Sequence, residues 1–506
     1  MIIANASQIR EIEAQTMSEY NMSSLQLMER AAQKCVDILL NLYPSKETDV
    51  VIFAGPGGNG GDGLAIARLL CHAGYHHIKA YLFNTRQSLS DDCSSNAERL
   101  KNECPNTCFI EVTQQFEPPK LTSKTLIIDA IFGIGLTRPL SGGFATLVRF
   151  INASDAQVVS IDIPSGLMCE DNSLNTPSTI VKAQHTITFS QPKLCMMLDD
   201  CQSYIGTLHI ADMGFSEEAI RTTDTPYYIT QHDEMVRELK KRVPWGHKGI
   251  FGHALLIAGS YGMAGAAILA AKACLKGGIG KLTIHTPLLN NDILQIAVPE
   301  ATLSHDPHDR YYSQAITATN YKAIGIGPGI GTNKDTAIAF IEQVSHAKAP
   351  LVLDADAINI LGSHKGWIPQ VPAYSIFTPH PKEMQRLGIF QENSYSLLLE
   401  AISMATRHKF YIILKGHHTA ICTPDGKVFF NTTGNSGMAT AGAGDVLTGL
   451  LTALLAQGYA TTAACRLAVY IHGLAGDLAS KELGEYSVTA QDILSHIPLA
   501  FKTLTR

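Results

Sequence analysis

The sequence has no excess of basic residues. Its 506 residues include 39 Lys and Arg against 45 Asp and Glu, for a formal net charge of −6. Proteins that bind nucleic acid or anionic membranes through their overall charge have a basic surplus, so the composition argues against both partners. With 45% hydrophobic and 17% charged residues, the chain is too apolar for intrinsic disorder. We expect a globular protein, and its length predicts two domains or more.

Segments that would direct the chain to or through a membrane are also lacking. The N-terminal stretch MIIANASQIREIEAQ has no basic region followed by a continuous apolar core, and it contains Glu11 and Glu13. These features argue against an export signal or a transit peptide. The longest uncharged run lies between Asp445 and Arg466, but its Thr, Gln and Gly residues suit a buried helix better than a bilayer span. We expect no transmembrane helix.

Cysteine motifs are absent as well. The 11 cysteines are odd in number and scattered, and the closest pair, Cys104 and Cys108, lacks the spacing of a zinc ribbon or finger. Neither a disulfide framework nor a zinc site is indicated. Reduced thiols are typical of the cytosol, so we expect a cytoplasmic protein.

Short apolar runs alternate with helical patterns along most of the chain. Runs such as VVIFA (50–54) and TLIID (125–129) are apolar at consecutive positions, as in a parallel sheet buried on both faces. The pattern restarts at HALLIAG (253–259), after a charged stretch (215–242) within which we place the domain boundary, near residue 223. We expect two α/β domains, residues 1–222 and 223–506, with ligands bound at the carboxyl ends of their strands.

A glycine-rich segment follows the first of these strands. Residues 55–63 read GPGGNGGDG and precede a helical pattern, so backbone amides and a helix N-terminus could approach a pyrophosphate. Asn59 and Asp62 could serve a hard cation or a ribose hydroxyl. The alternative is a tight turn whose glycines only meet backbone geometry. Two further strand ends, at Asp129 and Asp162, have the same character, although Asp is also a common cap or turn residue.

A second group of motifs lies in the C-terminal half. TAGAGD (440–445) precedes the uncharged run and could cradle a phosphoryl group, with Asp445 beside the acceptor hydroxyl. Helix capping by Asp445 is the alternative, but GAGD before an apolar helix is a specific signature of ribokinase-like phosphoryl transferases. KGHHT (415–419) ends a strand and could meet nucleotide phosphates or form a plain turn. GPGIG (327–331) and TPHPKE (378–383) follow two more strands.

Together these motifs resemble the bifunctional NAD(P)H-hydrate repair enzymes. The N-terminal motifs are similar to the Rossmann-like, three-layer α/β/α epimerase domain of that family. GSYGMAGA (259–266), GPGIG, TPHPKE, KGHHT and GNSGMATAGAGD (434–445) are similar to its ribokinase-like α/β dehydratase domain. The resemblance implies that the first domain interconverts the R and S forms of the hydrated dinucleotides NADHX and NADPHX. The second would dehydrate the S form with ADP as co-substrate, releasing NAD(P)H, AMP and phosphate.

The resemblance also implies cofactors, an assembly and site residues. Potassium is implied for the first domain, magnesium for the second, and a homo-oligomer for the chain. Asp162 and Asp445 would be catalytic. Residues contacting the epimerase substrate would be Gly58, Asn59, Gly60, Gly61, Asp62, Gly133, Ile134, Gly135, Leu136, Thr137, Arg138, Pro139 and Asp162. Potassium ligands would be Asn59, Asp129 and Ser165. The dehydratase substrate would contact Ala266, Gly329 or Gly331, His380 and Asp445, and the adenine nucleotide would contact Lys415, Gly416, His417, His418, Thr419 and Gly444.

The residues alone leave two other functions open. GAGD fits a kinase of a small alcohol or vitamin precursor, although the HPKE loop argues against it. The N-terminal domain could also be a non-catalytic nucleotide-binding module. A redox dehydrogenase is disfavoured, because no acid–base signature in the second domain accompanies the glycine segment.

Overall fold

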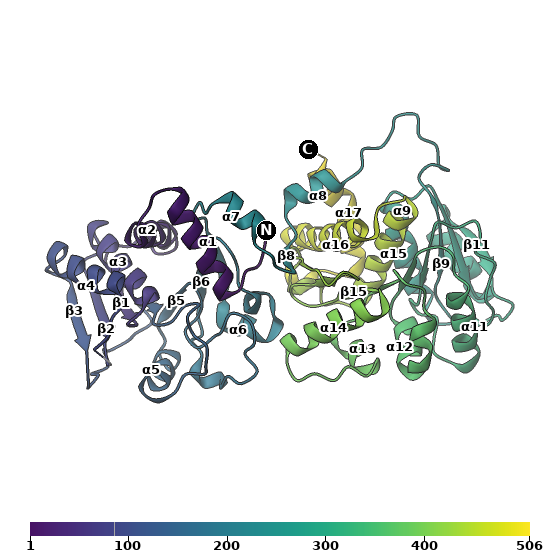
Figure 1. Cartoon of the computed structure of the whole chain (residues 1–506). Helices are drawn as coiled ribbons and strands as arrows, with labels where there is room; N and C mark the ends of the chain where they lie inside the picture. The colour runs from purple at the N-terminus through teal and green to yellow at the C-terminus, as the bar shows by residue number, and fades with distance from the viewer. Residues whose placement is uncertain (86, 506) are drawn as a thin grey trace. The chain divides into compact units, whose positions relative to one another are not determined.

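The computed structural model describes residues 1–85 and 87–505, which form two compact units (Figure 1). One unit comprises residues 2–225, and the other comprises Met1 and the residues from Pro226 onward. The division falls just after the boundary expected at residue 223. Each unit has its own sheet and its own hydrophobic core.

The N-terminal unit is built on a seven-stranded sheet in the order β3-β2-β1-β4-β5-β6-β7. All neighbouring pairs are parallel. The strands are β1 (Asp49–Ala54), β2 (Ile78–Phe83), β3 (Cys108–Val112), β4 (Thr125–Ala130), β5 (Gln157–Ile161), β6 (His185–Phe189) and β7 (Thr207–Ala211). The strand order reverses between β1 and β4, and open parallel sheets bind ligands in the crevice at such a point.

Helices cover both faces of this sheet. Ile52 and Ala54 pack in the core under α2, α3 and α4, whereas Val51 and Phe53 pack under α5, because alternate side chains of a strand point to opposite faces. The predicted α/β layering is therefore confirmed. The helices are α1 (Ala6–Glu19), α2 (Ser24–Leu42), α3 (Gly58–His72), α4 (Asp91–Glu103), α5 (Gly142–Asn152), α6 (Gln202–Ile205) and α7 (Glu217–Thr222), with 3₁₀ turns η1 (Pro177–Thr179), η2 (Leu194–Met197) and η3 (Asp199–Cys201).

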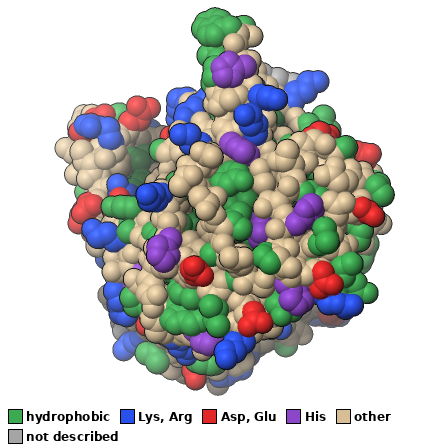
Figure 2. All heavy atoms as spheres, turned by 90° about the vertical axis from the view of Figure 1, so that its right-hand side faces the viewer, with side chains coloured by type: hydrophobic (Ala, Val, Ile, Leu, Met, Phe, Trp, Pro, Cys, Tyr) green, Lys and Arg blue, Asp and Glu red, His purple; other side chains and the backbone are tan. Residues whose placement is uncertain are grey.

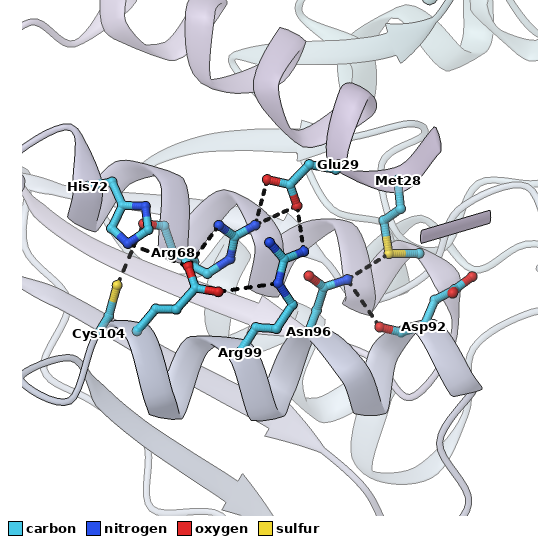
Figure 3. Close-up of polar contacts among 9 residues, drawn as sticks. Met28, Glu29, Arg68, His72, Asp92, Asn96, Arg99 and Cys104 are labelled. Atoms are coloured by element: carbon cyan, nitrogen blue, oxygen red, sulfur yellow. Dashed lines mark hydrogen bonds and ion pairs between the residues drawn. The ribbon is translucent and has the colours of Figure 1, made fainter. Parts of the chain in front are cut away.

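A buried arginine ties α3 to two neighbouring helices (Figure 3). Arg68 on α3 is 3% exposed and donates to both carboxylate oxygens of Glu29 on α2, at 2.7 and 2.5 Å. It also donates to Glu103 on α4 at 3.2 Å, and Arg99 on α4 bonds the same two glutamates. Charge-assisted bonds of this kind are strong and directional. The network holds α3 in place, and the first turn of α3 is the glycine segment.

The C-terminal unit has a ten-stranded mixed sheet in the order β11-β10-β9-β12-β13-β14-β15-β16-β17-β8. The strands from β11 to β15 are parallel, β16 is antiparallel to both neighbours, and β8 is parallel to β17. Their bounds are β8 (Tyr227–Ile229), β9 (His253–Ile257), β10 (Lys281–Thr286), β11 (Thr302–His305), β12 (Ala323–Ile326), β13 (Leu351–Leu353), β14 (Ile376–Phe377), β15 (Tyr411–Leu414), β16 (Ala420–Cys422) and β17 (Val428–Phe430).

Helices also cover both faces of the second sheet. Figure 1 shows α8, α9, α15, α16 and α17 on one face and α11 to α14 on the other, which confirms the second α/β unit. The helices are α8 (His232–Glu238), α9 (Ala264–Lys276), α10 (Asn291–Ala297), α11 (Lys334–Ser345), α12 (Asp356–Ser363), α13 (Pro381–Arg386), α14 (Ser394–His408), α15 (Ala443–Ala456), α16 (Thr461–Leu483) and α17 (Ala490–Leu504), with 3₁₀ turns η4 (Leu288–Asn290), η5 (Lys365–Gln370), η6 (Ser436–Met438) and η7 (Glu485–Ser487).

The uncharged run after Asp445 differs from its prediction, because it forms two helices rather than one. α15 ends at Ala456, and Gly458 follows with φ of +78°, a conformation that favours glycine and ends the helix. α16 then begins at Thr461. Across the described residues, no helix is both long and apolar enough to span a membrane. All 11 cysteines lie in the described part of the chain, and none forms a disulfide.

Candidate active sites

A pocket of about 510 Å³ lies at the carboxyl edge of the N-terminal sheet. It is bordered by α1, α2, the first turn of α3 and the segments that follow β4, β5 and β6. The expected site residues that line it are Gly58, Asn59, Asp62, Gly133, Ile134, Gly135, Leu136 and Asp162. The others do not line it. Gly60 and Gly61 are buried, Thr137 and Arg138 are exposed, and Pro139 is half-buried.

The glycine segment is a helix N-terminus rather than an extended loop. α3 begins at Gly58, so amides without intrahelical partners border the pocket. A Cβ on Gly60 would collide with the backbone of Gly55, and one on Gly63 would lie 2.6 Å from the Cβ of Ala130. Nothing lies within 4 Å of a Cβ on Gly58. Packing therefore requires Gly60 and Gly63, whereas Gly58 leaves space for a ligand.

A buried ion pair lies against this pocket. The Nζ atom of Lys193 is 2.5 Å from Oδ1 of Asp162 and 2.6 Å from Oγ1 of Thr188. Oδ2 of Asp162 accepts the N–H of Ile134 at 2.9 Å. Asp162 has φ of +67°, a left-handed conformation that Asp adopts more readily than most residues. The sequence prediction missed Lys193, because a lone lysine 31 residues after Asp162 belongs to no motif.

Two further carboxyl groups line the pocket. Burial raises the pKa of Glu13 on α1 to about 7, and the nearby Asp162 adds to the rise. Burial also raises the pKa of Asp62 well above its ordinary value, and Asp162 contributes again. Near neutral pH Glu13 can therefore both donate and accept a proton beside the Lys193–Asp162 pair. From the sequence alone, Glu13 counted only as evidence against a transit peptide.

A polar cluster around Asp129 is fully buried. Oδ1 of Asp129 accepts the hydroxyl of Ser165 at 2.6 Å, and Oδ2 accepts the hydroxyl of Ser160 at 2.7 Å and the N–H of Ser165 at 2.8 Å. Burial raises the pKa of Asp129, although the bonds from Ser165 and Ser160 oppose the rise.

Asn59 lies near this cluster. A Cβ on Gly133 would be 3.4 Å from the Asn59 side chain, and the preceding N–H, that of Phe132, donates to Ser165. The three expected potassium ligands thus converge on one short segment. Both polar atoms of the Asn59 side chain are buried and have no hydrogen-bond partner among the described residues. An unsatisfied buried amide is costly, and a bound cation would satisfy its oxygen.

The second site is organised by another lysine–aspartate pair. Nζ of Lys415 is 3.0 Å from Oδ1 of Asp354 and 3.8 Å from Oε2 of Glu383. Asp354 is 2% exposed and also accepts the hydroxyls of Thr378 at 2.7 Å and Thr448 at 2.8 Å. Burial lowers the pKa of Lys415, but the carboxylates of Asp354 and Glu383 more than offset this, so the ammonium stays charged.

Asp445 lies in the first turn of α15, close to this pair. Gly442, with φ of +91°, is the N-cap of the helix, and a Cβ on Gly444 would be 3.4 Å from Nζ of Lys415. Burial raises the pKa of Asp445 to about 7, and Asp354 adds to the rise. No described residue donates a hydrogen bond to this carboxyl group, so burial and the neighbouring charges alone shift its pKa. The structure thus gives the capping position to Gly442.

His380 is the N-cap of α13 at the same sheet edge. Its Nδ1 accepts the backbone N–H of Glu383 at 3.2 Å, and the backbone N–H of His380 donates to Oε2 of Glu383 at 2.9 Å. Burial and the charge of Lys415 lower the pKa of His380. With Nδ1 as acceptor, a neutral imidazole carries its proton on Nε2 and can donate to a ligand there.

The remaining expected residues lie on neighbouring segments. A Cβ on Gly329 would be 3.2 Å from the Cβ of Ala266, whereas nothing lies within 4 Å of one on Gly331. Residues 415–419 connect the antiparallel strands β15 and β16, and Gly416 and His417 there are exposed. Beside Gly331 is a polar hollow of about 420 Å³, lined by Thr332, Asp356, Asn359, Gly362, Ser363 and Arg386.

Comparisons with known proteins cover both units. A family model described as YjeF-related protein N-terminus matches residues 24–195, and one described as NAD(P)H-hydrate dehydratase matches residues 254–499. The bifunctional NAD(P)H-hydrate repair enzyme Nnr of Moorella thermoacetica is 31% identical, covering 100% of this chain and 97% of that protein. The enzyme of the same name from Vibrio cholerae is 33% identical, covering 97% and 96%.

A solved structure gives a match over part of the chain. It is the ADP/ATP-dependent NAD(P)H-hydrate dehydratase of Bacillus subtilis, co-crystallised with ATP and Mg²⁺, at 30% identity and a TM-score of 0.48. The match covers 55% of this chain and 98% of that one. The full-length matches to the repair enzymes, together with the two family models, mean that this chain belongs to the family of bifunctional NAD(P)H-hydrate repair enzymes.

Proposed function

We propose that this chain interconverts R- and S-NAD(P)HX in its N-terminal unit and dehydrates the S form with ADP in its C-terminal unit. One observation supports both assignments. Each unit has a lysine–aspartate pair beside the N-terminus of a helix at the carboxyl edge of its sheet. Lys193 and Asp162 lie by α3, and Lys415 and Asp354 lie by α15. Free helix amides suit phosphate groups, and the paired ions suit proton transfer and charge stabilisation.

The first pocket fits a reaction that moves protons. The R and S hydrates differ at the ring carbon that bears the hydroxyl, so their interconversion must break and re-form a bond at that carbon. Asp162 is the proposed catalytic residue, and Nζ of Lys193 lies 2.5 Å from its Oδ1 and donates to it. Glu13, whose pKa burial raises to about 7, is the second proton carrier of the pocket. The helix amides from Gly58 onward would bind the pyrophosphate.

The second site fits phosphoryl transfer followed by elimination. Hydroxide is a poor leaving group, whereas phosphate is a good one. Asp445 accepts the proton of the ring hydroxyl, whose oxygen bonds to the β-phosphorus of ADP as the bond to AMP breaks. The ring nitrogen lone pair then expels phosphate, which leaves with the electron pair of the C–O bond, and the adjacent ring carbon loses a proton to water to restore the carbon–carbon double bond. Lys415 and the amide of Gly444 stabilise the phosphate charge, and His380 donates from Nε2 to the hydrate.

The residues of the second site fit magnesium. The described residues contain no cluster of three or more acidic, histidine or cysteine side chains able to hold a metal ion. Magnesium usually takes one or two carboxylates plus substrate phosphates. The Asp445 carboxylate, which makes no hydrogen bond to the described residues, supplies such a ligand beside the proposed phosphate position. Bound magnesium would neutralise charge on the nucleotide phosphates.

The cluster at Asp129 fits potassium. Its donors are one carboxylate, one hydroxyl and the unpartnered amide oxygen of Asn59, and a single negative charge suits a monovalent rather than a divalent ion. Asp129 and Ser165 would hold the ion together with Asn59. Bound potassium would offset the buried charge of Asp129 next to the substrate pocket.

A coupled assay tests the proposal. A mixture of R- and S-NADHX is incubated with the protein, ADP and magnesium, and NADH is followed by its absorbance at about 340 nm. We expect the whole mixture to be converted, with AMP and phosphate as products. Conversion of the S fraction alone would contradict the epimerase assignment. Accumulation of a phosphorylated product would favour the kinase alternative.

The expected homo-oligomer stays a prediction. Several large apolar side chains of η4 and α10 are exposed, including Leu288 at 54%, Ile293 at 48% and Ile296 at 82%. A patch of this kind suits a contact with a second copy of the chain. Sedimentation velocity of the full chain would decide between a monomer and an oligomer.

A further inference from the structure

A cavity of about 850 Å³ lies in the C-terminal unit, away from the proposed active site. It is bordered by α8, the segment after α8, the C-terminal ends of α9 and α15, and the last turns of α17. Its apolar wall consists of Val236, Leu239, Leu454, Pro498, Phe501 and Leu504, joined by the ring of Tyr459. The free energy of the system falls when an apolar group of a ligand replaces water against such a wall.

The polar part of the cavity is uniformly basic. Lys240, Lys241, Arg242 and Lys276 all line it, and no Asp or Glu of the described residues does. All four cations are exposed, and none of them forms an ion pair with a carboxylate of the described residues. Four like charges around one space repel one another, and an anion would relieve that repulsion.

Two of the cations have a structural role that the other two lack. Nζ of Lys240 donates to the carbonyl of Gly458 at 2.6 Å, and Nη2 of Arg242 donates to the carbonyl of Gly278 at 2.6 Å. They thereby satisfy carbonyls at the ends of α15 and α9, and they lie over the rings of Tyr459 and Phe251. Helix capping alone therefore explains only half of the basic rim.

Lys241 and Lys276 are the two cations of the basic rim that have no such structural role. Both are exposed, and neither makes a hydrogen bond or an ion pair within the described part of the chain. Their ammonium groups are free to meet a ligand at the mouth of the cavity. Lys241 also begins the segment 241–252 between α8 and β9, which projects as a loop in Figure 1. Figure 2 shows hydrophobic, basic and histidine side chains on this projection. Trp245 on this loop is 80% exposed.

The cavity is separate from the catalytic machinery. Asp445 is in the first turn of α15, whereas Leu454 and Gln457, which line the cavity, are at its other end. The 14 residues of α15 span about 20 Å. A ligand in the cavity would therefore not occupy the proposed nucleotide or hydrate site.

We infer that this cavity binds a single-chain anionic amphiphile, a fatty acyl anion with its carboxylate at the basic rim and its alkyl chain against the apolar wall. Lys241 and Lys276 hold the head group, supported by the charges of Lys240 and Arg242. Leu239 and Phe501 contact the chain. The inference depends on neither proposed reaction.

The test is calorimetric titration of the full-length protein with octanoate, decanoate and dodecanoate below their micelle concentrations. We expect saturable one-to-one binding that tightens about fifteenfold with each pair of buried methylenes. Lys241→Gln/Lys276→Gln should weaken dodecanoate binding about fivefold for each charge removed. The matched double variant Lys322→Gln/Lys348→Gln changes two exposed lysines outside the cavity and should bind as wild type. Val236→Phe, which narrows the cavity, should favour the shorter chains.

Several results would overturn the inference. Absence of saturable binding, or equal binding of dodecyltrimethylammonium, would mean that the basic rim has no role. Equal affinity for inorganic phosphate and dodecanoate would mean that the apolar wall has none. An unchanged affinity in the Lys241→Gln/Lys276→Gln variant would place the ligand elsewhere. Tighter binding of dodecyl phosphate than of dodecanoate would replace the fatty acyl anion with a phosphate-headed amphiphile.

Discussion

The ammonium of Lys193 lies 2.5 Å from the carboxylate of Asp162, and both side chains are buried, at 1% and 10% exposure. They come from different strand ends, since Asp162 follows β5 and Lys193 follows β6. Asp162 also orders the segment after β4 through its bond to the N–H of Ile134. One pair thus joins three of the strand ends that border the epimerase pocket.

Removing one partner of this pair should destabilise the N-terminal unit. Lys193→Met leaves the Asp162 carboxylate buried without its counter-ion, and such changes cost about 3–5 kcal/mol. In Lys193→Met/Asp162→Asn both charges are gone, and Asn tolerates the positive φ of this position, so the loss should be smaller. Urea unfolding of the single and double variants measures the difference. A double variant less stable than Lys193→Met would contradict this account.

Asp445→Asn should separate folding from catalysis. Asn has nearly the same size, and Gly442 rather than Asp445 is the N-cap, so the melting temperature should not fall below that of wild type. Asn cannot accept the hydroxyl proton, and loss of general-base help costs about 10²–10⁴ in rate. We expect ADP-dependent return of NADH to fall by that factor, while R-to-S epimerisation, measured by chromatography of the two hydrates, is unchanged. Near-wild-type dehydration would remove Asp445 from the mechanism.

Dehydration should also depend on pH near neutrality. Burial and Asp354 raise the pKa of Asp445 to about 7, so below that pH the free enzyme has a protonated carboxyl group that cannot act as a base. We expect kcat/KM for S-NADHX to fall about tenfold per unit below pH 7 and to level off above it. The residual activity of Asp445→Asn should lack this dependence. A wild-type profile that is flat between pH 6 and 8 would contradict the assignment.

The raised pKa of Asp445 should also make the stability of the fold depend on pH. A carboxyl group whose pKa rises on folding, here from 3.8 to about 7, stabilises the fold below its unfolded pKa, and that contribution is lost as pH rises through 7. Asp445→Asn should therefore gain stability relative to wild type between pH 5 and 8. Melting temperatures across this range, without nucleotide, measure the effect. A constant difference between the two proteins at all pH values would exclude it.

Potassium should stabilise the N-terminal unit through Asn59. Both polar atoms of this side chain are buried and have no partner among the described residues. In potassium-free buffer, Asn59→Ala should therefore raise the free energy of unfolding by about 1–3 kcal/mol, and the melting temperature with it. Added potassium should raise the melting temperature of wild type but not of the variant. Asp129→Ala should impair epimerisation and spare dehydration of pure S hydrate. Equal potassium responses in wild type and Asn59→Ala would remove Asn59 from the ion site.

The two units should fold separately. Each has its own sheet and core, and the chain divides between Thr225 and Pro226. We expect fragments 1–225 and 226–506 to be folded, with cooperative thermal unfolding followed by circular dichroism. The first should epimerise and the second should dehydrate the S hydrate. If both fragments unfold without cooperativity while the full chain keeps it, the units are not independent.

The sequence by itself determined the α/β class, the presence of two units and most motifs at the strand ends. These signals are local, because a buried parallel strand, a glycine turn and a helix N-terminus each depend on residues close together in the chain. The glycine segment and Gly442–Asp445 were found this way. Gly58 and Gly60 look alike in the sequence, however, and only packing distinguishes the glycine that borders the pocket from the one against Gly55.

Only the tertiary structure decided which side chains meet at each site. Lys193 reaches Asp162 across 31 residues, Lys415 reaches Asp354 across 61, and Thr448 reaches Asp354 across 94. No motif encodes such pairs, because chain order does not fix which strand ends become neighbours in a sheet. The pKa values near 7 of Glu13 and Asp445 have the same origin. Burial and a nearby carboxylate raise them, and both are properties of the folded chain alone.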